Sequence, residues 1–208
     1  VSLVQVINGR LKFVDLKSSA DVRAVSDADM PDRQGFDGNG NSFAAELTPP
    51  YTINVPTCAT LWLPEIRSGT ERSRQISFQW LRSSGPSSVR CRGQEIAVAP
   101  ARQAPTVRKV HLLAASVKAV ATVGVTLRFA DNSEQFITFP VSVWTQPPAN
   151  GEVVAHAMPY SRTGVPDAAG PPVSVFWYTI NVRESKKLTT IAFTNAPDVR
   201  ILAITTER

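Results

Sequence analysis

The stretch DGNGN, residues 37–41, places oxygen-bearing side chains at alternate positions, which is how calcium-binding loops begin. The helix–loop–helix calcium pattern is excluded, because Ser42 stands where that pattern requires a glycine and Thr48 where it requires a bidentate glutamate. A structural calcium site of another kind stays open, because three further carboxylates lie just upstream: Asp27, Asp29 and Asp32. The alternative is a turn that uses glycines for positive φ and asparagines to bond backbone groups. No other cofactor is expected.

A second set of residues suits a sugar. Tyr160 and Arg162, in MPYSRTG, follow an expected strand in a loop. An exposed tyrosine ring stacks on a sugar ring, and a guanidinium donates hydrogen bonds to its hydroxyl groups. We therefore take a loop surface with five residues as the candidate carbohydrate site: Tyr160 and Arg162, with Asp37, Asn39 and Asn41 as polar partners. A surface Tyr–Arg pair without a ligand is the alternative.

Catalytic motifs are absent from the sequence. His111 lies among apolar residues of an expected strand, which indicates a core histidine, and His156 lies near a strand end without a serine or cysteine nucleophile motif. The patterns GxSxG, HExxH, GxGxxG and the P-loop do not occur. The sequence therefore predicts a protein that is not an enzyme.

The chain is basic, with a net charge of +5, and arginine outnumbers lysine. Six arginines fall in one short span: Arg67, Arg72, Arg74, Arg82, Arg90 and Arg92. They form either a solvated positive region or a face that binds an anionic ligand. Nucleic acid is not expected as a partner, because the span has neither interleaved aromatics nor a basic helical stripe.

Two cysteines, Cys58 and Cys91, lack the spacing of a metal site. They form one disulfide if the chain is secreted, or remain two buried thiols. No apolar run approaches the roughly 20 residues that cross a bilayer, so no membrane partner is expected.

The strands that we expect to position these residues show apolar and polar side chains in alternation, with a period of two residues. Val123–Phe129 alternates apolar and polar side chains, Asp131–Ser133 breaks the pattern, and the alternation resumes up to Trp144. Two such runs joined by a short Asp/Asn/Ser turn predict a β-hairpin. Its expected core residues are Val125, Leu127, Phe129, Ile137 and Phe139.

Similar runs recur along the chain, and most prolines and glycines lie between them. The expected strands are 11–16, 58–64, 75–80, 94–98, 107–116, 151–157, 173–182, 187–193 and 199–206. Many short strands separated by turn residues predict an all-β, antiparallel, jelly-roll-like β-sandwich that forms one domain over residues 11–208. Residues 1–10 lack the features of a signal peptide and are expected to form a lead-in or linker.

Seven motifs, in order along nearly the whole chain, resemble a family of β-sandwich domains that accompany secreted glycoside hydrolases. They are Val14–Leu16, FDGNGNSFAAE at Phe36–Glu46, Gly93–Ile96, Val110–Ser116, Phe129–Ser133, NGEVVAHAMPY at Asn150–Tyr160 and Val199–Thr205. The segment Pro56–Ser88 departs from the family pattern, because it is longer and richer in arginine. The resemblance implies a non-catalytic, extracellular, carbohydrate-associated module, and it makes the loop at Asp37 an architectural landmark.

Two functions from different classes therefore stand. One is a carbohydrate-associated accessory module; the other is a structural or protein-interaction β-sandwich that contacts a neighbouring protein domain. Surface aromatics in a groove favour the first, and a broad apolar patch favours the second.

Overall fold

The computed structural model describes residues 6–7, 10–29, 32–48, 57–67, 70–80 and 85–208, with the backbone alone at 6–7, 57–67 and 70–75. Within these ranges the chain forms antiparallel sheets and no α-helix, which confirms the expected all-β, sandwich-like domain. Its helical turns are the 3-10 segments η1 (Ala45–Leu47) and η2 (Ala101–Gln103). No helix in this part of the chain is long and apolar enough to cross a membrane.

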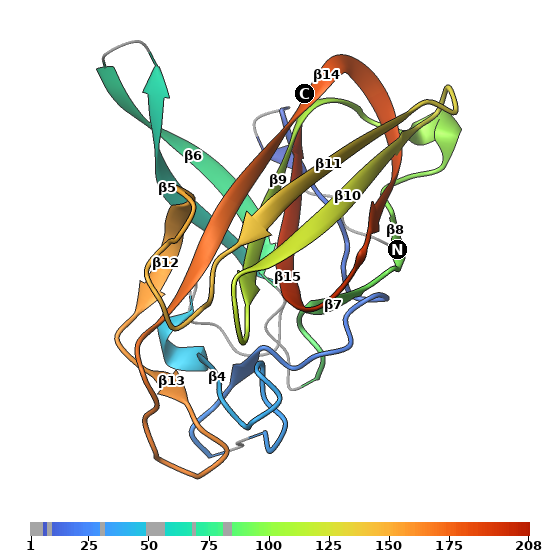
Figure 1. Ribbon diagram of the computed structural model, residues 1–208. Coiled ribbons are helices and arrows are strands. Elements are labelled where there is room, and N and C mark those ends of the chain that lie inside the picture. The colour runs from blue at the N-terminus through green and yellow to red at the C-terminus, as the bar shows by residue number, and fades with distance from the viewer. Residues whose placement is uncertain (1–5, 8–9, 30–31, 49–56, 68–69, 81–84) are drawn as a thin grey trace.

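One sheet of ten strands contains most of the structure (Figure 1). Its strands follow the order β1 (Val6–Ile7), β2 (Leu11–Phe13), β15 (Asn195–Glu207), β9 (Thr106–Ser116), β14 (Val173–Phe193), β10 (Ala121–Phe129) and β11 (Glu134–Val141). Beside this path, β12 (Val153–Met158) and β8 (Glu95–Ala97) pair with β14, and β7 (Val89–Arg92) pairs with β15. Because β1 pairs with β2, part of the expected lead-in joins the sheet.

Two smaller units complete the fold. β5 (Thr57–Arg67) and β6 (Thr70–Trp80) form a two-stranded ribbon. A three-stranded sheet has the order β13 (Ser161–Arg162), β4 (Ser42–Ala44) and β3 (Val25–Ser26), and its β3–β4 pair is parallel. The expected strands near 58–64 and 75–80 thus form one hairpin, whereas β3, β4 and β13 are too short to show a periodic pattern.

The long strand β14 joins two layers of the fold. We expected two strands, at 173–182 and 187–193, but the chain stays extended throughout. Its pairing with β9 shifts register between Asn181 and Lys186 and ends at Lys187, and from Leu188 to Phe193 β14 pairs with β10. In Figure 1 the ribbon of β14 curves accordingly, and β10 and β11 cross in front of β9 and β15.

The side chain of Gln135, on β11, stabilises this change of partner. Its Nε2 donates to the Asn181 carbonyl oxygen at 2.9 Å, and its Oε1 accepts from the Arg183 backbone N–H at 3.1 Å. A side-chain amide therefore takes the place of a paired peptide group where β14 has left β9.

Strand β9 is buried on both faces. Val110, Leu112 and Ala114 face a first core, which β10, β7, β8 and the end of β14 close. Leu113 and Ala115 face a second core, which contains Phe78 and Trp80 of β6 with Phe36, Phe43 and Trp144. Burial on both sides explains why VHLLAAS reads as a nearly continuous apolar run.

His111 interrupts that run and is 1% exposed, which confirms the expected core histidine. Trp177 Nε1 donates to His111 Nδ1 at 3.2 Å, and an indole nitrogen is a donor only. The neutral ring therefore carries its proton on Nε2, which lies 3.0 Å from Glu207 Oε2 and donates to it.

Cys91 is a buried free thiol of the first core, and burial raises its pKa to about 12. A thiol with so high a pKa stays protonated and unreactive at neutral pH. The side chain of Cys58 lies outside the described residues.

The predicted hairpin is present as β10 and β11. Asp131 Oδ1 accepts from the backbone N–H of Ser133 at 3.0 Å, and Asn132 takes a positive φ of 63°. Val125, Leu127 and Phe129 are buried as expected. Ile137 and Phe139 are only half-buried, which corrects the prediction, because β11 is the last strand of the sheet.

Phe136 is 58% exposed, and its position follows from a glycine on the neighbouring strand. A Cβ on Gly124 would lie 2.8 Å from the Phe136 ring and 2.6 Å from the Thr194 methyl group. The ring thus covers the backbone of Gly124, as an aromatic side chain does beside a glycine in a sheet.

Phe129→Ala should lower the free energy of unfolding by about 3–5 kcal/mol, because it opens a cavity in the first core. Phe136→Ala serves as the matched control on the same hairpin and should cost well below half as much, since that ring is mostly in water. Urea titrations of both variants measure the difference. Equal losses would show that the buried face of the hairpin has been misassigned.

Candidate ligand-binding site

The glycine-rich loop at residues 35–41 is held together by Asp37. Its Oδ1 accepts from the backbone N–H groups of Asn39 at 2.8 Å and Asn41 at 3.1 Å, and its Oδ2 accepts from Asn41 Nδ2 at 2.8 Å. Gly35, Gly38 and Gly40 all take positive φ. Asp37 therefore shapes the loop, as the architectural interpretation predicts, and Asn39 is exposed at its tip.

Two aromatic residues anchor this loop in the second core. Phe36 and Phe43 are both fully buried, and their ring centroids lie 4.8 Å apart. Each also packs against Trp144, at 5.0 and 5.3 Å. The loop is thus fixed to the rigid central strands, although it belongs to the surface.

The chain around Tyr160 lies alongside this loop. Ser161 pairs with Phe43, and Arg162 pairs with Ser42, in the β13–β4 ladder. Glycines permit the close approach of the two loops, because a Cβ on Gly40 would lie only 3.2 Å from the backbone of Gly164. The structure therefore brings the two segments of the candidate site together, which sequence alone left open.

Tyr160 and Arg162 converge on Glu46 of η1, a residue absent from the predicted site. Tyr160 Oη donates to Glu46 Oε1 at 2.7 Å, and Arg162 Nη2 donates to the same oxygen. The Arg162 guanidinium lies 5.4 Å from the centroid of the Tyr160 ring. Glu46 ends the FDGNGNSFAAE motif, which is the sequence signal that could have identified it.

The electrostatics of this cluster keep Glu46 ionised. Burial opposes its negative charge, but hydrogen bonds from its own backbone N–H, Tyr160 and Arg162 outweigh burial and lower its pKa. The hydrogen bond to Glu46, together with burial, raises the pKa of Tyr160, which stays a neutral donor at pH 7. Most of the charge of Arg162 is therefore balanced within the cluster.

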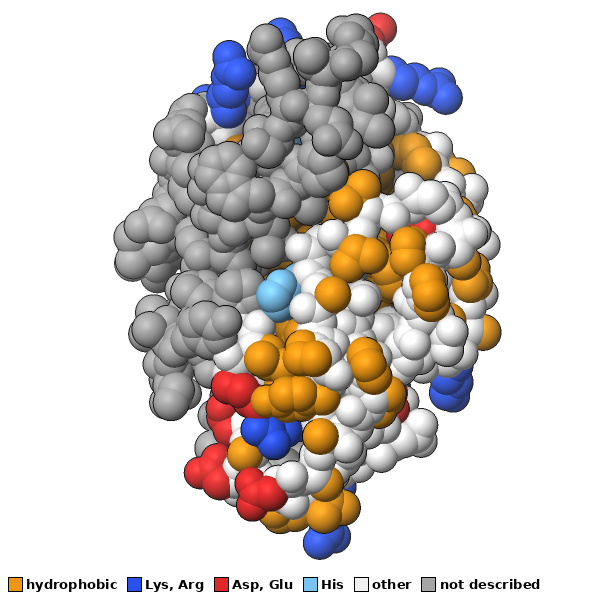
Figure 2. Space-filling view, turned by 90° about the vertical axis from the view of Figure 1, so that its left-hand side faces the viewer, with side chains coloured by type: hydrophobic (Ala, Val, Ile, Leu, Met, Phe, Trp, Pro, Cys, Tyr) orange, Lys and Arg blue, Asp and Glu red, His pale blue; other side chains and the backbone are white. Residues whose placement is uncertain are grey.

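The cluster is partly open to solvent. The side chain of Arg162 is 16% exposed and that of Glu46 is 38% exposed. Figure 2 shows one side of the molecule, where apolar side chains lie next to a group of acidic and basic side chains in the lower part of the view. The neighbouring His156 donates from Nε2 to the Leu47 carbonyl oxygen at 2.8 Å and so fixes η1 against β12.

The acidic residues upstream of the loop do not gather around one point. Asp32 Oδ1 accepts from the Gln34 backbone N–H at 3.0 Å, and Asp37 is engaged within its own loop. In the part of the chain that the structure describes, no three His, Cys, Asp or Glu side chains form a group that could hold a metal ion.

The expected basic face is described only in part. Arg90 and Arg92 lie on β7. The side chains of Arg67, Arg72 and Arg74, on the β5–β6 ribbon, and all of Arg82 lie outside the described residues.

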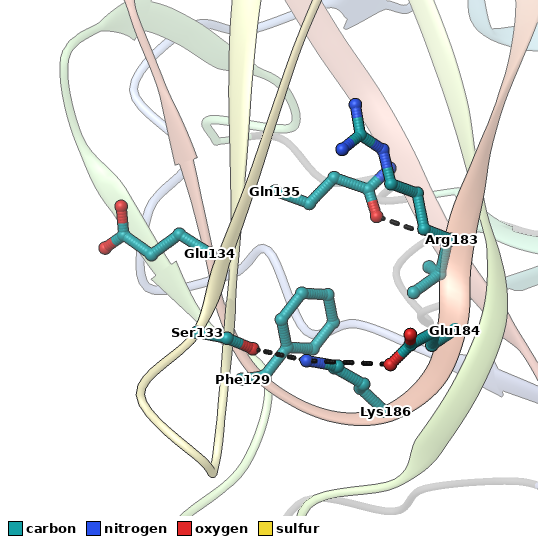
Figure 3. A pocket seen from close by; sticks show the side chains of 8 residues that line it. Phe129, Ser133, Glu134, Gln135, Arg183, Glu184 and Lys186 are labelled. Atoms are coloured by element: carbon teal, nitrogen blue, oxygen red, sulfur yellow. Dashed lines mark hydrogen bonds and ion pairs between the residues drawn. The ribbon is translucent and has the colours of Figure 1, made fainter.

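A small cavity of about 170 Å³ lies between the β10–β11 turn and the middle of β14, at the register shift of that strand (Figure 3). Phe129 is among its lining residues, and Lys186 Nζ lies 2.8 Å from Ser133 Oγ and 3.1 Å from Asp131 Oδ2. Its volume is below the roughly 300 Å³ at which ligand pockets begin, and its lysine is already paired, which makes it a weaker candidate than the surface at Tyr160.

No protein-family model and no curated protein sequence matches the chain. The functional argument therefore depends on the site itself.

The glycines of the loop allow a matched test of its geometry. Gly35 and Gly38 both have positive φ, but their surroundings differ. A Cβ added to Gly35 would lie 2.5 Å from the backbone of Asn41, whereas a Cβ added to Gly38 would point into open space. Gly38→Ala should cost about 1–2 kcal/mol for the left-handed conformation alone. Gly35→Ala should cost roughly 3 kcal/mol or more, because a backbone clash is added. Equal effects in urea titrations would refute the described loop conformation.

Glu46→Gln should lower the free energy of unfolding by roughly 1 kcal/mol at about pH 7, a modest amount because Glu46 is partly exposed. The pKa of Glu46 is lowered in the folded state, so this contribution is present above its ordinary value of 4.5 and is lost as pH falls through the lowered value. Urea titrations at about pH 7 and about pH 3 should therefore show the difference between wild type and variant shrinking in acid.

Glu184→Gln is the matched control, since its side chain is 78% exposed and its one ion pair, with Lys186, is long at 4.0 Å. Two outcomes would contradict the stabilising role of the Tyr160–Arg162–Glu46 cluster. One is a loss in the free energy of unfolding of Glu46→Gln that is the same at both pH values. The other is an equally large loss in Glu184→Gln.

Proposed function

We propose that this protein is a non-catalytic carbohydrate-binding module, the extracellular accessory domain of a glycoside hydrolase. The observation that supports it is the half-exposed Tyr160 beside Arg162 and Glu46, on a surface that the second core holds in place. This is the combination of an aromatic face with planar hydrogen-bonding groups that a hydroxyl-rich ligand needs.

The arrangement defines how a sugar would approach. Arg162 lies over the Tyr160 ring on one side, so a sugar ring would stack on the other side. Glu46 fixes both side chains before a ligand arrives, so little conformational entropy is lost on binding. Asn39, exposed at the loop tip, is the neighbouring amide best placed to bond a hydroxyl group, since Asp37 and Asn41 bond each other.

The exposed large hydrophobic residues among those described are Val120, Phe136, Val154 and Val165. The position of Phe136 is explained by Gly124. A broad apolar patch would be expected of a protein-interaction module, which is the alternative that the experiment below tests.

A glycan array on the isolated domain, followed by calorimetry with the best-bound glycan, tests the proposal. Tyr160→Ala should weaken binding roughly tenfold or more through loss of ring stacking, and it should lower the free energy of unfolding by no more than a single hydrogen bond contributes, through loss of the bond to Glu46. Tyr160→Phe keeps the ring and should keep most of the affinity.

An affinity that is unchanged in Tyr160→Ala would rule out this surface. Absence of binding to every glycan would favour the alternative, a structural or protein-interaction module.

A further inference from the structure

Arg90 and Arg200 face each other across β7 and β15. Between the pairs Ala196–Cys91 and Arg200–Arg90 the register shifts, so that β15 bulges at residues 197–199. Their neighbours Val89, Cys91, Val199 and Ile201 belong to the first core. Because side chains alternate along a strand, both arginines project from the opposite face, side by side.

Arg200 is buried and, among the residues that the structure describes, forms no ion pair. It is 3% exposed, its Nη1 donates to the carbonyl oxygens of Pro197 and Val199, and its Nε has no hydrogen-bond partner. The Nε of Arg90 is likewise buried and without a partner. Burial, then the charge of Arg90, lowers the pKa of Arg200 to about 10, so it is still charged at neutral pH.

The carboxylates of Asp21 and Asp198 attract Arg200, but burial and the charge of Arg90 outweigh them, so the pKa of Arg200 is still lowered. Asp21 Oδ1 accepts from the backbone N–H of Arg90 at 2.8 Å, and Asp198 lies 3.8 Å from Lys118 Nζ. Within the described residues, no Asp or Glu forms an ion pair with Arg90 or Arg200. Two like charges placed opposite each other on neighbouring strands repel, and an unpaired buried charge is destabilising.

We propose that Arg90 and Arg200 bind an oxyanion, a sulfate or phosphate group, at the bulge of β15. A tetrahedral oxyanion presents several acceptor oxygens, so it bonds two guanidinium groups at once and removes their repulsion. Arg90 is only half-buried, so the pair can be reached from solvent on its side. The site lies on other strands than Tyr160 and does not depend on the proposed sugar binding.

Thermal unfolding in millimolar sodium sulfate, against sodium chloride of equal ionic strength, tests the proposal. Sulfate should raise the unfolding temperature of the wild type, and calorimetry should give binding about tenfold or more weaker in Arg90→Gln and Arg200→Gln. Arg183→Gln, an exposed arginine of β14, is the control and should respond as the wild type does.

The proposal would be overturned if sulfate did not raise the unfolding temperature of the wild type, or if it raised the unfolding temperature of all four proteins equally. Should Arg200→Gln fail to fold, Arg90→Gln alone decides, because Arg90 is half-buried and its Nε bonds no partner. A parallel titration with heparin identifies the source of the group: tighter binding than free sulfate indicates a sulfated polysaccharide, and equal binding indicates the free ion.

Discussion

The constraint on which the structure depends is the burial of β9 and β15 between two cores. Most side chains on these two strands are buried, so a polar side chain there needs hydrogen-bond partners. His111 meets this requirement through Trp177 and Glu207. The long β14 pairs first with β9 and then with β10, and Gln135 supplies hydrogen bonds to its backbone at the register shift.

The second core also holds a surface loop in place. Phe36 and Phe43 insert into it from either side of the glycine-rich loop and hold that loop against Trp144. The β13–β4 pairs then place Tyr160 and Arg162 beside the loop and within reach of Glu46. A surface assembled in this way keeps its geometry without a ligand, which is what preorganised recognition requires.

How much of the fold and of the candidate site can be predicted from the sequence depends on how far apart along the chain the interacting residues lie. The β10–β11 hairpin was predictable because its alternation and its Asp131–Ser133 turn are local. The burial of Ile137 and Phe139 was overestimated because an edge position depends on strand order, which periodicity does not encode. The continuity of β14 was missed since the polar residues at 183–187 resemble a turn. In the site, Tyr160, Arg162 and the loop of Asp37 were recognised as residue types, but Glu46 was not, because its partners lie more than 110 residues away.

The two polar surfaces differ in how their charge is balanced, and that difference sets what each would bind. At Tyr160, the ionised Glu46 neutralises Arg162, so the surface offers hydrogen-bonding groups and an aromatic ring but little net charge. An anionic ligand at this surface would meet the carboxylate of Glu46, which is already paired with Arg162. At the bulge of β15, no described carboxylate forms an ion pair with Arg90 or Arg200, and Asp21 and Asp198 only partly offset their repulsion, so an added negative group would relieve it further. Neutral hydroxyl-rich ligands therefore suit the first surface and oxyanions suit the second, and a polysaccharide carrying both kinds of group would have a separate surface for each.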